Sequence, residues 1–277
     1  MRFWGAMLLA MVASVGAACG DGGDPGVEVG AGDPDRRYQG SFTVLESADH
    51  GPELCVQIAA SMPPQCSGLP VVGWDWDAVA GEETVGGTTW GGWHVIGTYD
   101  GEELTLTEQP GPPRPHDEAE TVPDSSPACD QPDVVDPSHA AAEWEAMSQD
   151  HGAFELPDLV AAWVSDPAGD WDGPFVGSAV VLPGAAPAAV ARIREHYGGP
   201  LCVVEQDAPT ADELASIRDE LLDGSAGAAL GRPQDVVTDE RRGVVVVTVW
   251  VADEAAAAYA ERRWGDLVQL NGLLQPA

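Results

Sequence analysis

Aromatic side chains gather in one short stretch of the chain, where they could form a ligand-binding surface. Four tryptophans lie within twenty residues and partly alternate with aspartates. The candidate ligand-binding group is Trp74, Asp75, Trp76, Asp77, Trp90 and Trp93. Aromatic rings stack on sugars or peptides, and carboxylates accept hydrogen bonds from hydroxyl groups. A small β barrel also needs large side chains in its core, so core packing is the interpretation we favour, with ligand binding as the alternative.

The start of the chain has the pattern of an export signal. Arg2 supplies a positive charge, an apolar run follows over residues 3–15, and small residues lead to Cys19. The ending VGAAC resembles the lipobox of bacterial lipoprotein precursors. This resemblance implies removal of a signal peptide over residues 1–18, a diacylglycerol group on the Cys19 sulfur, and anchoring to the outer face of the cell membrane. The alternative is an ordinary signal peptide with an incidental cysteine.

The other cysteines are predicted to form disulfides. Four remain besides Cys19, namely Cys55, Cys66, Cys129 and Cys202. An even number in an exported chain favours two disulfides over free thiols. Of the three connectivities, we expect Cys55–Cys66 and Cys129–Cys202, because the first pair belongs to one small module. The sequence has no CxxC and no Cys/His cluster with zinc-ligand spacing, which argues against metal binding or redox chemistry by these cysteines.

The charge of the chain excludes several classes of function. There are 46 acidic and 12 basic residues, and the formal net charge is -34. So acidic a protein repels nucleic acid, whose phosphates require clustered positive charge. Every basic residue is an arginine, so a P-loop lysine, a pyridoxal Schiff base and a Ser-Lys dyad are all excluded. We expect no cofactor.

No recognisable catalytic motif accompanies these features. The six histidines are scattered without an HExxH pattern, and neither Ser178 nor Ser225 lies in a GxSxG elbow. The segment DPAGDWDG is a weak candidate for a calcium loop, through Asp166, Asp170 and Asp172. An acidic turn is the favoured alternative, because the acid at the first and the Glu at the twelfth EF-hand position are missing.

Composition divides the rest of the chain into four segments. Residues 19–37 are rich in Gly, Asp and Pro and predict a flexible tether. Residues 38–109 predict an all-β domain of about five short strands, a small OB-like barrel or a sandwich. Residues 110–137 are dense in proline and acid and predict a linker, which a Cys129–Cys202 disulfide would strap onto the second domain. Residues 138–277 predict an α+β domain.

Two local patterns give these domains more detail. In the all-β domain, Asp100-Gly101 predicts a two-residue type I′ hairpin turn. In the α+β domain, the order strand, helix and strand is predicted twice, by AVVLPGAAPAAVARIREHYGGPLCVV and by VTVWVADEAAAAYAERRWGDLVQL. This internal repeat favours a ferredoxin-like split βαβ arrangement. We therefore expect four strands in one sheet, with helices near 187–197 and 254–264 on the same face; the strands are Ala179–Leu182, Leu201–Val204, Val244–Val251 and Leu267–Leu270.

Three functions are compatible with these observations. We favour a non-enzymatic envelope lipoprotein that acts as a binding or structural module, with the membrane and an envelope protein or a glycan as partners. One alternative is a binding protein for glycans or cell-wall fragments that uses the Trp74–Trp93 group. The other is a hydrolase with dispersed carboxylates. The runs WDWD, TTWGGWHV and GTYDG resemble uncharacterised secreted proteins of high-GC Gram-positive bacteria, which implies export and no particular activity.

Overall fold

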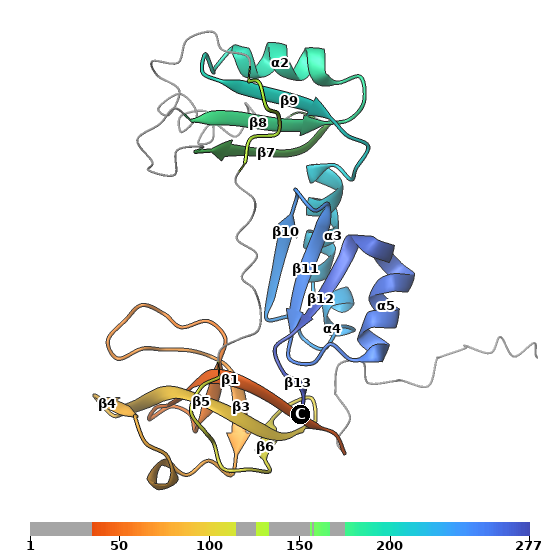
Figure 1. Ribbon diagram of the computed structural model, residues 1–277. Helices are drawn as coiled ribbons and strands as arrows, with labels where there is room; N and C mark the ends of the chain where they lie inside the picture. The colour runs from red at the N-terminus through yellow and green to blue at the C-terminus, as the bar shows by residue number, and fades with distance from the viewer. Residues whose placement is uncertain (1–34, 115–125, 133–155, 157, 167–174) are drawn as a thin grey trace, which may run out of the picture.

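The computed structural model describes residues 35–114, 126–132, 156, 158–166 and 175–277. These residues form a β barrel and two small α+β units, and the unit with strands β10–β12 lies between the other two (Figure 1). The predicted signal peptide and Cys19 lie outside the described residues. So do nearly all of the predicted tether and much of the predicted linker.

The N-terminal region is a mixed β barrel. Its strands are β1 (Arg37–Glu46), β2 (Glu53–Cys55), β3 (Leu69–Val72), β4 (Glu83–Val85), β5 (Thr88–Tyr99), β6 (Leu104–Leu106) and β13 (Gln275–Pro276). They are ordered β13-β1-β2-β3-β6-β5-β4, and an additional β1–β5 pairing closes five of them into a barrel. The β3–β6 pair is parallel and the other pairs are antiparallel. The predicted all-β character is confirmed.

The alternation of side chains in the two longest strands explains why the barrel has a core. In β1, Tyr38, Phe42 and Val44 face inward, as do Trp93 and Val95 in β5. Period-two alternation puts such residues on one face of a strand. The ring of Trp93 folds back over Gly91, where a Cβ atom would lie 2.4 Å from the ring. Glycine at position 91 is therefore required for this packing.

The hairpin between β5 and β6 differs from the prediction. Pairing resumes at Tyr99 and Leu104, so the loop has four residues, and the two-residue type I′ turn is wrong. Asp100 Oδ1 accepts hydrogen bonds from the backbone N–H groups of Glu102 and Glu103, both at 2.9 Å. These bonds lower the pKa of Asp100. An aspartate that satisfies backbone donors in this way stabilises a longer turn.

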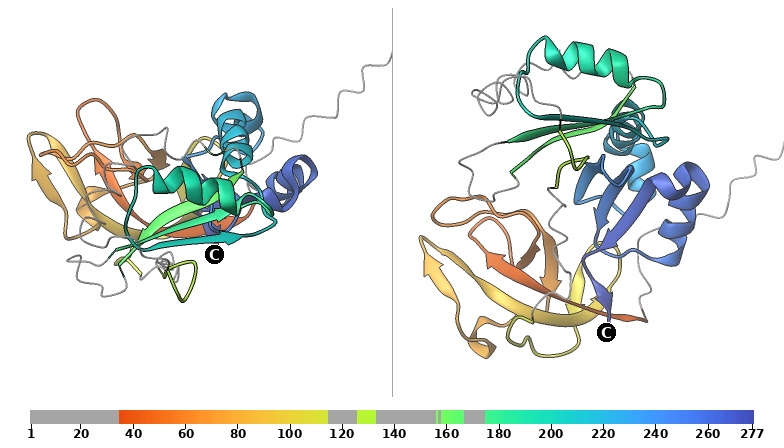
Figure 2. Two further views of the ribbon diagram at one scale, coloured as in Figure 1. Left: turned by 90° about the horizontal axis from the view of Figure 1, so that it is seen from above. Right: turned by 45° about the horizontal axis from the view of Figure 1, so that its top comes forward.

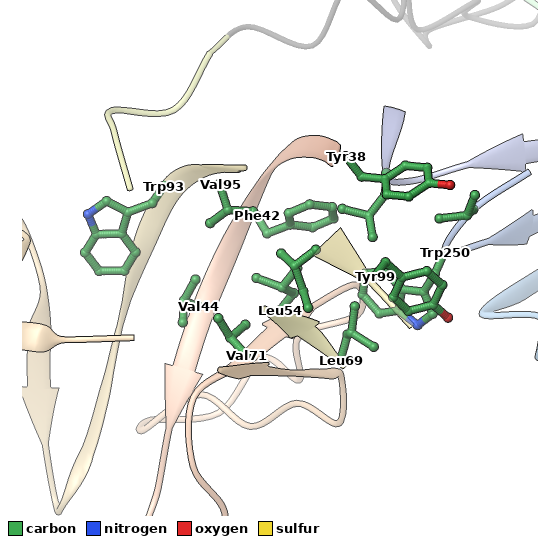
Figure 3. Close-up of a cluster of buried hydrophobic side chains, with 13 residues drawn as sticks. Tyr38, Phe42, Val44, Leu54, Leu69, Val71, Trp93, Val95, Tyr99 and Trp250 are labelled. Carbon is green, nitrogen blue, oxygen red and sulfur yellow. The ribbon is translucent and has the colours of Figure 1, made fainter. Parts of the chain in front are cut away.

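Both ends of the barrel core are occupied by aromatic side chains. Figure 3 shows Trp93 at one end of the buried cluster and Trp250 at the other. Trp250 comes from the chain directly after β11, and its ring centroid lies 5.8 Å from that of Phe42. Leu274 is buried in the same cluster, and β13 pairs with β1. The C-terminal residues thus complete the N-terminal barrel.

The first α+β unit is a three-stranded sheet covered by one helix. It contains β7 (Leu159–Ser165), β8 (Val176–Val181), α2 (Ala186–Arg194) and β9 (Leu201–Glu205). β7 and β8 are antiparallel, β8 and β9 are parallel, and α2 covers one face (Figure 2). Ala189, Ile193 and Tyr197 pack against that face. The helix ends at Arg194, three residues before the end of the predicted range 187–197.

The opposite face of this first sheet is partly covered by other parts of the chain. Segment 126–132 is fastened to it by the Cys129–Cys202 disulfide and by a bond from Ala128 N to Ser178 Oγ. The Arg241 guanidinium, from the turn between β10 and β11, lies 4.0 Å from the centroid of the Trp163 ring. The predicted disulfide strap is therefore confirmed.

The second α+β unit has the same strand order and carries more helices. It contains α3 (Ala211–Leu222), α4 (Ser225–Ala228), β10 (Asp235–Asp239), β11 (Val244–Val249), α5 (Glu254–Trp264), η4 (Gly265–Leu267) and β12 (Val268–Gly272). Val245, Val247 and Val249 pack with both α3 and α5, so the two helices share one face. Thr210 forms a capping box with Glu213 at the start of α3, and Asp253 is the N-cap of α5.

The prediction of one shared sheet is wrong. The strands form two separate sheets, β7-β8-β9 and β10-β11-β12. Each βαβ half is preceded by its own antiparallel strand, so β8 and β11 already have neighbours on both sides. Each sheet also buries its own helices, which removes the need for a common face. The repeat in sequence corresponds to two ββαβ units of equal strand order.

Candidate functional site

The predicted tryptophan group is only partly brought together. Trp74, Trp76 and Trp93 form a triad whose ring centroids lie 5.1 to 5.5 Å apart, with interplanar angles of 69 to 71°. Trp93 is buried, while Trp74 and Trp76 are half-buried and pack against the barrel core. Trp90 is three residues from Trp93 along β5, so it points to the opposite face. It shares that face with His94.

The connection between β3 and β4 positions the triad. Trp76 begins a 3-10 helix, η1 (Trp76–Ala78), and Asp75 caps it by accepting a hydrogen bond from Asp77 N at 3.0 Å. Trp76 Nε1 donates to the Glu46 carboxylate. Trp74 and Trp76 therefore lie after the end of β3 and not on one face of a strand. Asp75, the aspartate between them, holds the turn, because its side chain accepts this backbone hydrogen bond.

The triad geometry is that of packed aromatic rings. Edge-to-face contacts at these distances are the preferred arrangement for aromatic pairs in cores. A stacking platform needs exposed coplanar faces, whereas each of these rings turns its face or edge to another. Trp74 Nε1 is buried without a hydrogen-bond partner among the described residues. The arrangement favours the interpretation that Trp74, Trp76 and Trp93 close one end of the barrel.

The weak metal candidate is not assembled in the described part of the chain. Asp166 directly follows β7, and Asp170 and Asp172 lie outside the described residues. Among the described residues, no three His, Cys, Asp or Glu side chains lie close enough together to hold a metal ion. Both predicted disulfides are present, Cys55–Cys66 in the barrel and Cys129–Cys202 in the first α+β unit.

A different cluster lies on the outer face of the barrel, where residues 109–114 cross β5. His94 and Gly111 exchange backbone hydrogen bonds of 2.9 and 3.0 Å, which hold this crossing segment in place. Between the segment and the strand is a cavity of about 270 Å³. Its lining consists of His94, Ile96, Glu108, Gln109, Gly111, Pro112, Pro113 and Arg114. We call it the His94 cavity.

The histidine in this cavity has an incomplete set of hydrogen bonds. His94 is 8% exposed, and its Nδ1 lies 3.2 Å from the Oγ atom of Ser41, its cross-strand neighbour. Ser41 Oγ also accepts a hydrogen bond from Arg114 N at 3.0 Å. His94 Nε2 is buried without a partner among the described residues. Burial, and secondarily the positive charge of Arg114, lower the pKa of His94, so the imidazole is neutral at pH 7.

Sequence spacing does not reveal this cluster. Ser41 lies 53 residues from His94 and 73 residues from Arg114, and only the closure of the barrel brings them together. The single sequence signal is the alternation in β5, which directs His94 away from the core face that holds Trp93 and Val95.

A second cavity, of about 340 Å³, lies where α5 begins beside β1 and β13. Asp253 and Glu254 contribute acidic side chains to it, and Arg36 a basic one. Asp253 already accepts a hydrogen bond of 2.7 Å from Ala256 N as the cap of α5. The carboxylate of Asp253 is therefore already used to cap the helix, which makes this cavity a weaker candidate for a binding site.

Comparisons with known proteins add no family to these observations. No protein-family model matches the chain, and a search of curated proteins finds no match. Within the described ranges, no helix has the length and apolar character needed to cross a membrane. The resemblances to lipoprotein precursors and to secreted proteins stay predictions.

Proposed function

We propose that this protein is a non-enzymatic envelope lipoprotein, tethered to the outer face of the membrane through Cys19, and that it acts as a binding or structural module. The observation that supports it best is the pair of disulfides, which staple the barrel and the first α+β unit. Disulfides persist in oxidising compartments, as expected for an exported chain. The flexible composition of residues 19–37 would hold the folded part away from the membrane.

We further propose that the barrel is of the OB type. Its closed order β1-β2-β3-β6-β5, with the parallel pair β3–β6, supports this assignment. Barrels of this type bind ligands on strand faces and loops. With a net charge of -34, the partner is an envelope protein or a glycan and not a nucleic acid. A partner would meet the outside of the barrel, because its core is filled from Trp93 to Trp250.

The glycan-binding alternative receives less support. It would use the tryptophan group as a stacking surface, yet the triad rings stand at about 70° to one another. No specific contact among the described residues favours the hydrolase alternative. We therefore retain the tethered binding or structural module as the function.

Membrane fractionation of cells that produce a Cys19→Ser variant tests the tether. We expect the parent protein in the membrane fraction with incorporated labelled fatty acid, and the variant in the soluble fraction without label. A Ser14→Ala variant, altered in the same segment, should behave as the parent does. If Cys19→Ser fractionates with the membrane as the parent does, the lipid anchor is wrong.

A further inference from the structure

We propose that the His94 cavity is a binding site for a small carboxylate that carries a short apolar group. The proposal goes beyond the tether and does not depend on Cys19. It is based on three features of the described residues in the same cavity: a buried nitrogen that none of them pairs with, an arginine to which none of them offers a carboxylate, and an apolar wall.

The arginine of this cavity has no ion pair among the described residues. Acidic residues outnumber arginines 46 to 12, and most arginines in the described part lie beside a carboxylate. Arg114 instead donates to the amide oxygen of Gln39 at 3.3 Å, and the described residues offer it no carboxylate. Glu108, which also lines the cavity, is paired with Arg37. The cavity therefore has an available positive charge.

The hydrogen bonds of Ser41 assign the tautomer of His94. Ser41 Oγ accepts from Arg114 N, and His94 Nδ1 is the acceptor that the described residues offer to the Ser41 hydroxyl proton. Donation from Ser41 to Nδ1 leaves the imidazole proton on Nε2. The unpartnered Nε2 is then an N–H donor. Buried donors without an acceptor are rare and destabilising, so a ligand oxygen at this position would satisfy a real deficit.

These groups define the chemistry of the ligand. Two donors, the neutral Nε2–H and the charged guanidinium of Arg114, suit the two oxygens of a carboxylate. Ile96, Pro112 and Pro113 supply an apolar wall for a short carbon chain. A volume of about 270 Å³ is slightly below the usual range for small-molecule sites, which favours a small ligand. The carboxylate could belong to a free acid or to the C-terminus of a peptide.

Nuclear magnetic resonance of the purified, ¹⁵N-labelled protein tests the proposal. The ring nitrogen shifts should show the Nε2–H tautomer of His94 at pH 7. Butyrate should bind saturably and raise the pKa of His94, because a nearby anion favours the imidazolium. Butyramide has the same shape without the charge and should leave the pKa unchanged. An Nδ1–H tautomer, or no response of His94 to butyrate or to the peptide described below, would overturn the proposal.

Variants and a second probe separate the possible explanations. Arg114→Gln should weaken butyrate binding about tenfold, which corresponds to about 1.4 kcal/mol. Arg262→Gln removes the same charge from the exposed face of α5 and should not change the affinity. Equal weakening by both variants would show a general charge effect and overturn the site. The dipeptide Ala-Pro, with a free or an amidated C-terminus, distinguishes a free acid from a peptide C-terminus as the source of the carboxylate. If the free form binds more tightly than butyrate and the amidated form does not, the ligand is a peptide C-terminus.

Discussion

Trp250 should stabilise the barrel, although it lies far along the chain from strands β1 to β6. It is 4% exposed and packs against Phe42, although it directly follows β11 of the second α+β unit. Replacement by alanine removes the ring that fills one end of the core. We expect Trp250→Ala to destabilise the barrel itself and not only the unit from which Trp250 comes.

The size of the effect follows from the buried area. A buried tryptophan removes roughly 200 Å² from water. At ~25 cal/mol per Å², this burial is worth about 5 kcal/mol, of which alanine retains a part. The expected loss is about 4 kcal/mol, within the range measured for large-to-small core substitutions. Domains are stable by only about 5–15 kcal/mol, so most of the stability of the barrel could be lost.

Native-state hydrogen exchange of the β1 and β5 amides is the appropriate assay, because these strands pair along ten residues of the barrel. Their free energy of opening should fall in Trp250→Ala. Trp163→Ala is the control, since Trp163 is half-buried in β7 and makes no part of the barrel core. If the β1 and β5 amides exchange equally slowly in Trp250→Ala and in the parent, the C-terminal segment does not complete the barrel.

Three further outcomes are expected. Removing the first disulfide with Cys55→Ala and Cys66→Ala should lower the free energy of unfolding in urea by roughly 3 kcal/mol, and an unchanged midpoint would contradict its role. Thr210→Ala should cost about 1 kcal/mol in thermal unfolding, because the cap of α3 accepts from Glu213 N; Ser216→Ala on the same helix should cost less. The pKa of His94 is lowered from 6.5 in the fold, so the unfolded chain binds its proton first as pH falls. The part of the folding stability that depends on neutral His94 should therefore be fully present above pH 6.5 and decline below it. His94→Gln should remove this part of the decline. Identical pH profiles of stability for the parent and for His94→Gln would refute the prediction.

Local features could be predicted from the sequence because they depend on neighbouring residues. The caps at Thr210 and Asp253 need only a side chain and the backbone N–H groups three residues on. The Cys55–Cys66 pair closes a short loop, and alternation in β1 and β5 requires only a period of two. The turn after Tyr99 was predictable in position, while its length depended on how Asp100 satisfies two backbone donors.

Sheet membership and the His94 cavity were decided by tertiary structure. Which strand edges meet depends on what else competes for them, and β7 and β10 take the edges that a single shared sheet would have needed. The return of β13 to β1 joins the two ends of the described chain, and closure of β5 onto β1 places Ser41 beside His94. These are contacts between residues far apart in sequence, whose pairing depends on the packing of the whole fold, so no local pattern specifies them.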